Sequence, residues 1–62
     1  MTRRPLSPAM AQALADLRAA GANGLRASHT DASLCALERR GLARTDPAAD
    51  RVLTAQWLLT HP

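Results

Sequence analysis

The amino-acid sequence is short of several residue types, and each shortage narrows what the chain can be. It has one cysteine and one tryptophan, and it contains no phenylalanine or tyrosine. A single cysteine excludes a disulfide within the chain, and the two histidines have no metal-site spacing with it. No apolar run approaches the roughly 18 residues of a membrane span, and the first residues lack the apolar stretch of a secretory signal. We therefore expect a cytoplasmic protein with no metal, no cofactor and no membrane association.

The residues that are present favour helix. Fourteen alanines and ten leucines dominate the 62 residues, whereas isoleucine is absent and valine occurs once. A chain of this length buries only about 60% of the surface that its unfolded form exposes, so a single domain has a thin core and a homodimer is expected. The net charge of +3 comes from eight arginines and five acidic residues. This charge is compatible with a surface that binds duplex DNA.

The first periodic segment has a start signal, an apolar face and a stop signal. Ser7 followed by Pro8 is typical of a helix start, because the hydroxyl can accept a free backbone N–H and proline is tolerated at the first helical position. Leu14 and Leu17 recur at the spacing of one helical face, and Gly21 supplies the stop. The pattern predicts a helix from Pro8 to the residue before Gly21.

A second helix is predicted from about Asp31 to residue 40. The hydroxyl of Ser28 or Thr30 is expected to cap it, with Asp31 in the positive first turn. Leu34 and Leu37 mark the inner face of this helix and are expected to hold it against the first one. The opposite side carries small and basic residues, namely Ala32, Ala36, Arg39 and Arg40.

The C-terminal third changes from helical periodicity to alternation. Strands are predicted over residues 42–45 and 53–60, with residues 46–50 as the tip between them. Residues 25–27 are expected to form a short extended piece. One face of the second strand should point to the core, with Leu53, Ala55, Trp57 and Leu59 on it. The predicted fold class is mainly α with a small β-hairpin, within the α+β class.

The segment LCALERRGLA at residues 34–43, followed by WLLT at residues 57–60, resembles winged helix-turn-helix regulators of the MarR-like kind in a minimal form. The resemblance covers roughly residues 8–60. It implies that the helix before the Gly-Leu pair lies in the DNA major groove and that the following strands form a wing. It also implies a winged-helix domain over residues 8–62 after a flexible basic arm over residues 1–7. Only about nine residues separate the two helices, so the intervening helix of the family is reduced here to a turn and a short strand.

These features predict a small DNA-binding transcriptional regulator. Arginines at the helix end and on the wing are expected to contact phosphates, and polar residues near the helix entrance are expected to contact base edges. The predicted DNA-binding residues are Arg39, Arg40, Arg44 and Arg51 for phosphates and His29, Thr30 and Ser33 for base edges. The arm that carries Arg3 and Arg4 is expected along the minor groove.

Other interpretations stay open at this point. Arg39 and Arg40 near a helix C-terminus also favour the negative end of the helix dipole without any ligand. The main alternative function is a winged-helix module that binds a protein and not DNA, because folds of this kind are reused for partner binding. An enzyme is not expected, since no triad or metal set is recognisable and no small-molecule substrate is evident. Cys35 is expected to be a half-buried filler, and Leu58 either an ordinary exposed leucine or part of a self-association patch.

Overall fold

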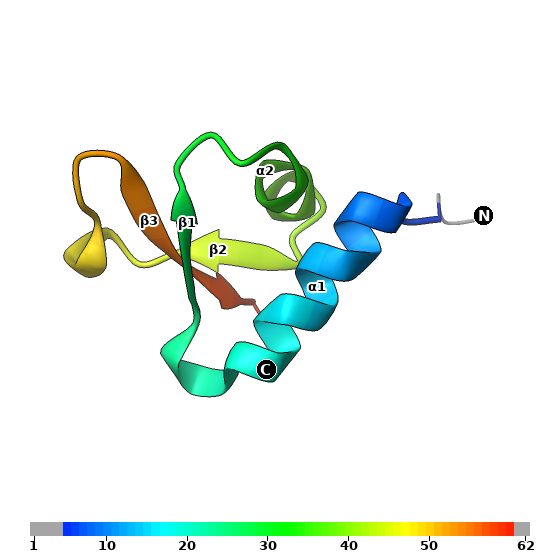
Figure 1. Ribbon diagram of the computed structural model, residues 1–62, viewed down its shortest axis with the longest axis horizontal. Helices are drawn as coiled ribbons and strands as arrows, with labels where there is room; N and C mark the ends of the chain where they lie inside the picture. Colours follow the sequence, from blue (N-terminus) through cyan, green and yellow to red (C-terminus); the bar gives the residue numbers. More distant parts are fainter. Residues whose placement is uncertain (1–4, 61–62) are drawn as a thin grey trace.

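The computed structural model describes residues 5–60 as two α-helices and a three-stranded antiparallel sheet (Figure 1). In chain order the elements are α1 (Pro8–Ala20), the 3-10 turn η1 (Gly21–Asn23), β1 (Leu25–Ser28), α2 (Ala32–Arg39), β2 (Ala43–Thr45), the 3-10 turn η2 (Pro47–Ala49) and β3 (Thr54–Leu59). The α+β class is confirmed. Its β part is larger than the predicted hairpin, because the extended piece after α1 pairs with β3 as a third strand.

Helix α1 begins and ends where local signals place it. The Ser7 hydroxyl accepts a hydrogen bond from the backbone N–H of Met10 at 3.2 Å, and Pro8 occupies the first helical position. Gly21 follows the last residue of the helix, and its N–H bonds to the Arg18 carbonyl. Both predicted boundaries of this helix are confirmed.

The cap of α2 differs from the prediction. The Asp31 carboxylate accepts the N–H of Leu34 at 2.9 Å, so Asp31 is itself the N-cap. The hydroxyls of Ser28 and Thr30 lie 3.1 Å apart and bond to each other. The expected hydroxyl cap is therefore wrong. Ser28 is the last residue of β1 and lies too early in the chain to cap the helix, and the Thr30 hydroxyl is bonded to Ser28.

At its other end α2 closes with a Schellman arrangement. The N–H of Leu42 bonds to the Leu37 carbonyl at 3.0 Å, and the N–H of Gly41 bonds to the Glu38 carbonyl at 2.9 Å. Leu42 is half-buried and packs against the core. The turn therefore satisfies helical carbonyls and leads the chain directly into β2.

The sheet has the strand order β1-β3-β2, so the last strand lies in the middle. Trp57 of β3 is opposite Leu25 on one side and Thr45 on the other. Cross-strand partners share a face of a sheet, and successive residues alternate between faces. The face that carries Trp57 and Ala55 contacts both helices and is called the core face here. The opposite face is called the outer face.

Strand β3 starts one residue later than predicted, and this changes the place of Leu53. Leu53 was expected on the core face but is 78% exposed. The reason is a tight turn in which the N–H of Arg51 bonds to the Thr54 carbonyl at 2.9 Å. Leu53 lies inside that turn and before the sheet, so the alternation of β3 does not apply to it.

The core is small and contains one aromatic ring. Seven hydrophobic residues are buried in the described part of the chain: Ala13, Leu17, Leu34, Leu37, Ala43, Ala55 and Trp57. The indole N–H of Trp57 donates to the Ser28 carbonyl at 3.2 Å, so the ring is buried without an unsatisfied donor. Full burial of a leucine side chain contributes about 1.5–3 kcal/mol. Leu34 and Leu37 are buried on the inner face of α2, and α2 contacts α1, so the predicted packing of these leucines against the first helix is confirmed.

The N-terminal segment joins the domain before α1. Leu6 is half-buried against the core, and the Pro5 carbonyl accepts a hydrogen bond from Arg40 at 3.5 Å. Residues 1–4, which carry the arginines of the predicted arm, lie outside the described residues, as does His61. Within residues 5–60 neither helix combines the length and apolar character needed to cross a bilayer.

Candidate nucleic-acid interface

The outer side of α2 is open to solvent. Leu34 and Leu37 turn inward with 2% and 0% exposure. Ala32 and Arg39 on the other side are exposed, and Ala36 between them is half-buried. This side is therefore slim along the helix and becomes basic at its C-terminal end. A surface of this shape allows another molecule to approach the helix backbone closely.

Arg39 and Arg40 stand together at the C-terminal end of α2. Both are exposed. Arg40 also reaches the Pro5 carbonyl, so part of its guanidinium is used inside the protein. Helical spacing places Arg39 on the same side as Ala32 and Ala36, away from the inward-facing leucines of α2. The structure thus brings these two predicted residues together.

His29 and Thr30 form the loop that enters α2. His29 links this loop to the wing, which is defined here as the loop of residues 46–53 together with the ends of β2 and β3. Its Nε2 lies 2.8 Å from the Arg51 carbonyl, and because a carbonyl only accepts, the ring N–H donates. The Cys35 thiol bonds to the His29 carbonyl at 3.3 Å, which holds the loop on the helix, and Cys35 is half-buried as expected. His29 and Arg51 are 22 residues apart in the sequence and were predicted separately, yet the fold joins them.

Arg26 positions the wing, and sequence reasoning missed it. Its Nη1 donates to the Thr54 hydroxyl at 3.0 Å, and its Nη2 donates to the Ala49 carbonyl at 2.9 Å. The second contact ties β1 to η2 in the loop between β2 and β3. Asp46 stabilises the same loop by accepting the N–H of Ala48 at 3.0 Å. Only the pairing of β1 with β3 brings Arg26 near Thr54, so no local pattern could have shown this role.

Arg44 lies on a different surface from Arg39. In β2 it is opposite Leu58 of β3, and Leu58 alternates with Trp57. Both Arg44 and Leu58 therefore belong to the outer face of the sheet, away from the two helices. Leu58 is half-buried, which places it between the two expectations for this residue. The predicted phosphate contacts thus occupy two surfaces and not one.

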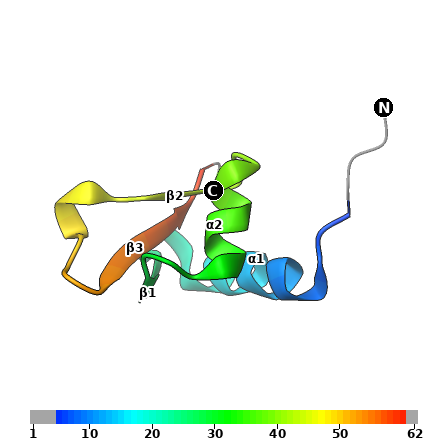
Figure 2. The same cartoon turned by 90° about the horizontal axis from the view of Figure 1, so that it is seen from above.

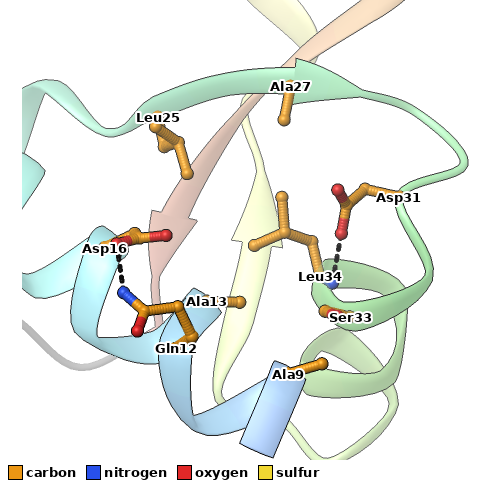
Figure 3. Close-up of a pocket in the computed structure, with 9 residues that line it drawn as sticks. All are labelled: Ala9, Gln12, Ala13, Asp16, Leu25, Ala27, Asp31, Ser33 and Leu34. Atoms are coloured by element: carbon orange, nitrogen blue, oxygen red, sulfur yellow. Dashed lines mark hydrogen bonds between the residues drawn. The ribbon is translucent and has the colours of Figure 1, made fainter.

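Ser33 is half-buried at the edge of a pocket between α1, β1 and the start of α2 (Figure 3). The pocket has a volume of about 290 Å³. It is lined by Ala9, Gln12, Ala13, Asp16, Leu25, Ala27, Asp31, Ser33 and Leu34. Gln12 donates to Asp16 at 2.9 Å, and Asp31 is engaged as the cap of α2. Two carboxylates at this pocket repel a phosphate, so Ser33 lies in a more acidic environment than the outer side of α2.

The wing extends to one end of the molecule, whereas α1 begins at the opposite end (Figure 2). The tip of the wing consists of η2 and the turn that follows it, which contains Val52 and Leu53 (Figure 2). The contact between His29 and Arg51 sets this tip beside the entrance of α2.

Comparisons with protein-family models, with curated proteins and with solved structures gave no match. The candidate interface is thus defined by the geometry of the chain itself. It combines the outer side of α2, the His29–Thr30 loop and the wing. Among residues 5–60, no group of three or more histidine, cysteine or acidic side chains could hold a metal ion.

Proposed function

We propose that this chain is a minimal winged-helix module that binds duplex DNA and acts as a small transcriptional regulator. The observation that carries the proposal is the open outer side of α2, with small residues along it and Arg39 at its end. The major groove of B-form DNA is about 12 Å wide and admits a helix. Small side chains let the helix approach the base edges, and the arginine then reaches a phosphate.

The order of the elements supports the same proposal. In a winged-helix module a helix is followed by two strands whose loop lies beside it, and here β2 and β3 follow α2 directly. The hydrogen bond from His29 to the Arg51 carbonyl keeps the wing next to the helix entrance. A duplex that receives α2 in its major groove would then meet the wing along the adjacent backbone.

Each predicted contact has a place in this proposal. Arg39, Arg40 and Arg51 contact phosphates from the helix end and the wing, and Arg44 contacts the flanking backbone from the outer face of the sheet. His29, Thr30 and Ser33 are the residues proposed to contact base edges. The role is binding and not catalysis.

A homodimer belongs to the proposal because the core of the chain is small. The seven hydrophobic residues that are buried among residues 5–60 leave little reserve of stability for a chain of this length. A symmetric pair of modules would also present two copies of α2 to a palindromic site. Sedimentation equilibrium of the free protein measures this state directly.

The decisive experiment is a salt series on duplex DNA. Neutralisation of three or four phosphates by the proposed arginines predicts a slope of about −3 in log K against log salt. Changing Arg39 and Arg40 together to Ala should flatten the slope by about two units, because two phosphate contacts are removed. Arg18→Ala is the matched control, since Arg18 is an exposed arginine near the end of α1 and outside the proposed contacts.

Two results of this series would overturn the proposal. The first is a wild-type protein whose binding does not depend on salt. The second is a double variant that keeps the wild-type slope while its circular dichroism shows an intact fold. A slope change in Arg18→Ala as large as that of the double variant would move the interface to α1.

The second candidate function is binding of a protein partner without DNA. The observation that favours it is the pocket beside α1, which has apolar walls and the carboxylates of Asp16 and Asp31. A basic and apolar segment of another protein fits this chemistry better than a nucleic acid does. This candidate predicts that the protein binds such a partner and that log K for DNA does not change with log salt.

A further inference from the structure

The tip of the wing exposes two adjacent aliphatic side chains. Val52 is 94% exposed and Leu53 is 78% exposed, and they are the large hydrophobic residues left in solvent by the described part of the chain. Isolated exposed leucines are ordinary in proteins, but an adjacent pair at the end of a projecting turn is a small apolar knob. The chain leaves this pair outside although its core contains few large side chains.

The knob is held in place by its surroundings. The N–H of Arg51 bonds to the Thr54 carbonyl at 2.9 Å and closes the turn around the two residues. Arg26 bonds to both Thr54 and the Ala49 carbonyl, and His29 bonds to the Arg51 carbonyl. Four hydrogen bonds thus fix the base of the turn, and the exposure of the knob is a property of the fold.

We propose that Val52 and Leu53 act as a wedge that enters the minor groove, partly unstacks one base step and bends the duplex. This inference rests on the proposed function, because the wing meets DNA only if α2 does. Proteins that bend DNA through the minor groove insert apolar side chains, leucine among them, between base pairs. The groove is about 6 Å wide, which admits a single turn of chain but no helix.

The charges around the tip leave entry into the groove to the apolar side chains, with Arg51 as the one phosphate contact beside them. Arg51 is exposed beside the knob, whereas Arg26 is engaged inside the wing. Asp50 is exposed next to Arg51 and opposes it, and the Asp46 carboxylate is turned to the backbone of its own loop. The positive and negative side chains at the tip therefore balance. Removing the knob should abolish bending and leave the salt dependence of binding unchanged.

The wedge also predicts which DNA is preferred at this position. Pyrimidine–purine steps such as TA and CA/TG unstack most easily, so the deformation costs least there. A duplex with a TA step under the wing should be bent more than a duplex with a GC step at the same place. This preference would arise without any hydrogen bond to the bases of that step.

The test uses the full chain and a duplex labelled with a fluorescent donor and acceptor at its ends. End-to-end energy transfer measures bending, and an adenine analogue at the TA step reports unstacking by a rise in its fluorescence. The wild-type protein should raise both signals at salt concentrations where it binds. Val52→Ser combined with Leu53→Ser should lose both signals and keep the wild-type salt slope. Arg51→Ala should keep both signals and lose about one unit of the slope.

The outcomes separate the wedge from the proposed function. If the wild-type protein binds with a salt slope but changes neither signal, the wedge is refuted and the DNA-binding proposal stands. If the wild-type protein does not bind the duplex at all, both are refuted. If the serine double variant dissociates a dimer in sedimentation while bending is unchanged, the knob is a contact between copies or with a protein, and the wedge is wrong. Both side chains are exposed, so circular dichroism of the variant should match the wild type.

Discussion

Replacing Gly24 by alanine should destabilise the protein severely. Gly24 lies between η1 and β1 with φ 75° and ψ −171°, a backbone region that is almost exclusive to glycine. A Cβ atom at this position would overlap the Trp57 carbonyl oxygen and lie 2.5 Å from Cδ2 of Leu58. The Trp57 carbonyl belongs to the backbone of β3, the central strand, so it cannot move aside without disturbing the sheet.

The magnitude follows from two separate effects. Placing an L-residue in this backbone region costs about 1–3 kcal/mol. Forcing extra atoms into a packed site costs about 1–3 kcal/mol in addition. A chain of this length has a total free energy of unfolding of only about 3–9 kcal/mol. We therefore expect Gly24→Ala to lose most of the stability of the domain or to unfold it.

Gly21 provides a matched control in the same connection. It has φ 67° and ψ −150°, close to the conformation of Gly24, but a Cβ there would meet nothing within 4 Å. Gly21→Ala should thus cost only the backbone strain, about 1–3 kcal/mol. The difference between the two variants isolates the overlap with the sheet.

Urea denaturation followed by the fluorescence of Trp57, the one tryptophan of the chain, measures both variants, with circular dichroism as a second probe. In a domain of this size each kcal/mol corresponds to roughly 4–8 °C in Tm. The reasoning is refuted if Gly24→Ala is as stable as Gly21→Ala. Equal losses would mean that the strand can shift freely and that only the backbone conformation matters.

Two further predictions concern the cap of α2 and the attachment of the wing. Asp31→Ala should lose about 1 kcal/mol of unfolding free energy because it removes the N-cap, whereas Ser28→Ala should change this free energy by less than about 0.5 kcal/mol. Equal losses in the two variants would show that the Ser28 hydroxyl contributes to the cap after all. Arg26→Gln should accelerate amide hydrogen exchange in the β2–β3 loop while α1 exchanges as in the wild type, because the bonds to Thr54 and the Ala49 carbonyl are removed. Unchanged exchange in that loop would show that Arg26 does not hold the wing.

The elements whose signals are local were predictable from the sequence. Ser7, Pro8 and Gly21 lie within a few residues of the backbone groups that they satisfy, so they determine the ends of α1 wherever that helix packs. The spacing of Leu34 and Leu37 likewise fixes which side of α2 turns inward. The opposite side, with Arg39, could therefore be predicted as exposed.

The candidate site was predictable in its residue types and only partly in its arrangement. Period-2 alternation shows that Arg44 and Leu58 can share a face, but not that the helices cover the other one. The position of Ser33 beside an acidic pocket depends on how α1 and β1 meet α2. The sequence therefore predicts one contact surface, whereas the fold divides these residues between two.

By itself the sequence determined the two helices, their inner leucines and the change to strands near the C-terminus, because capping and periodicity act over a few residues. Only the tertiary structure decided that β1 joins the sheet, that Asp31 caps α2, that Leu53 stays in solvent and that His29 and Arg26 hold the wing. These features depend on contacts between residues about 20 or more positions apart, or on where a strand ends once it has paired. Pairing register and burial are properties of the whole fold, and no short stretch of chain carries them.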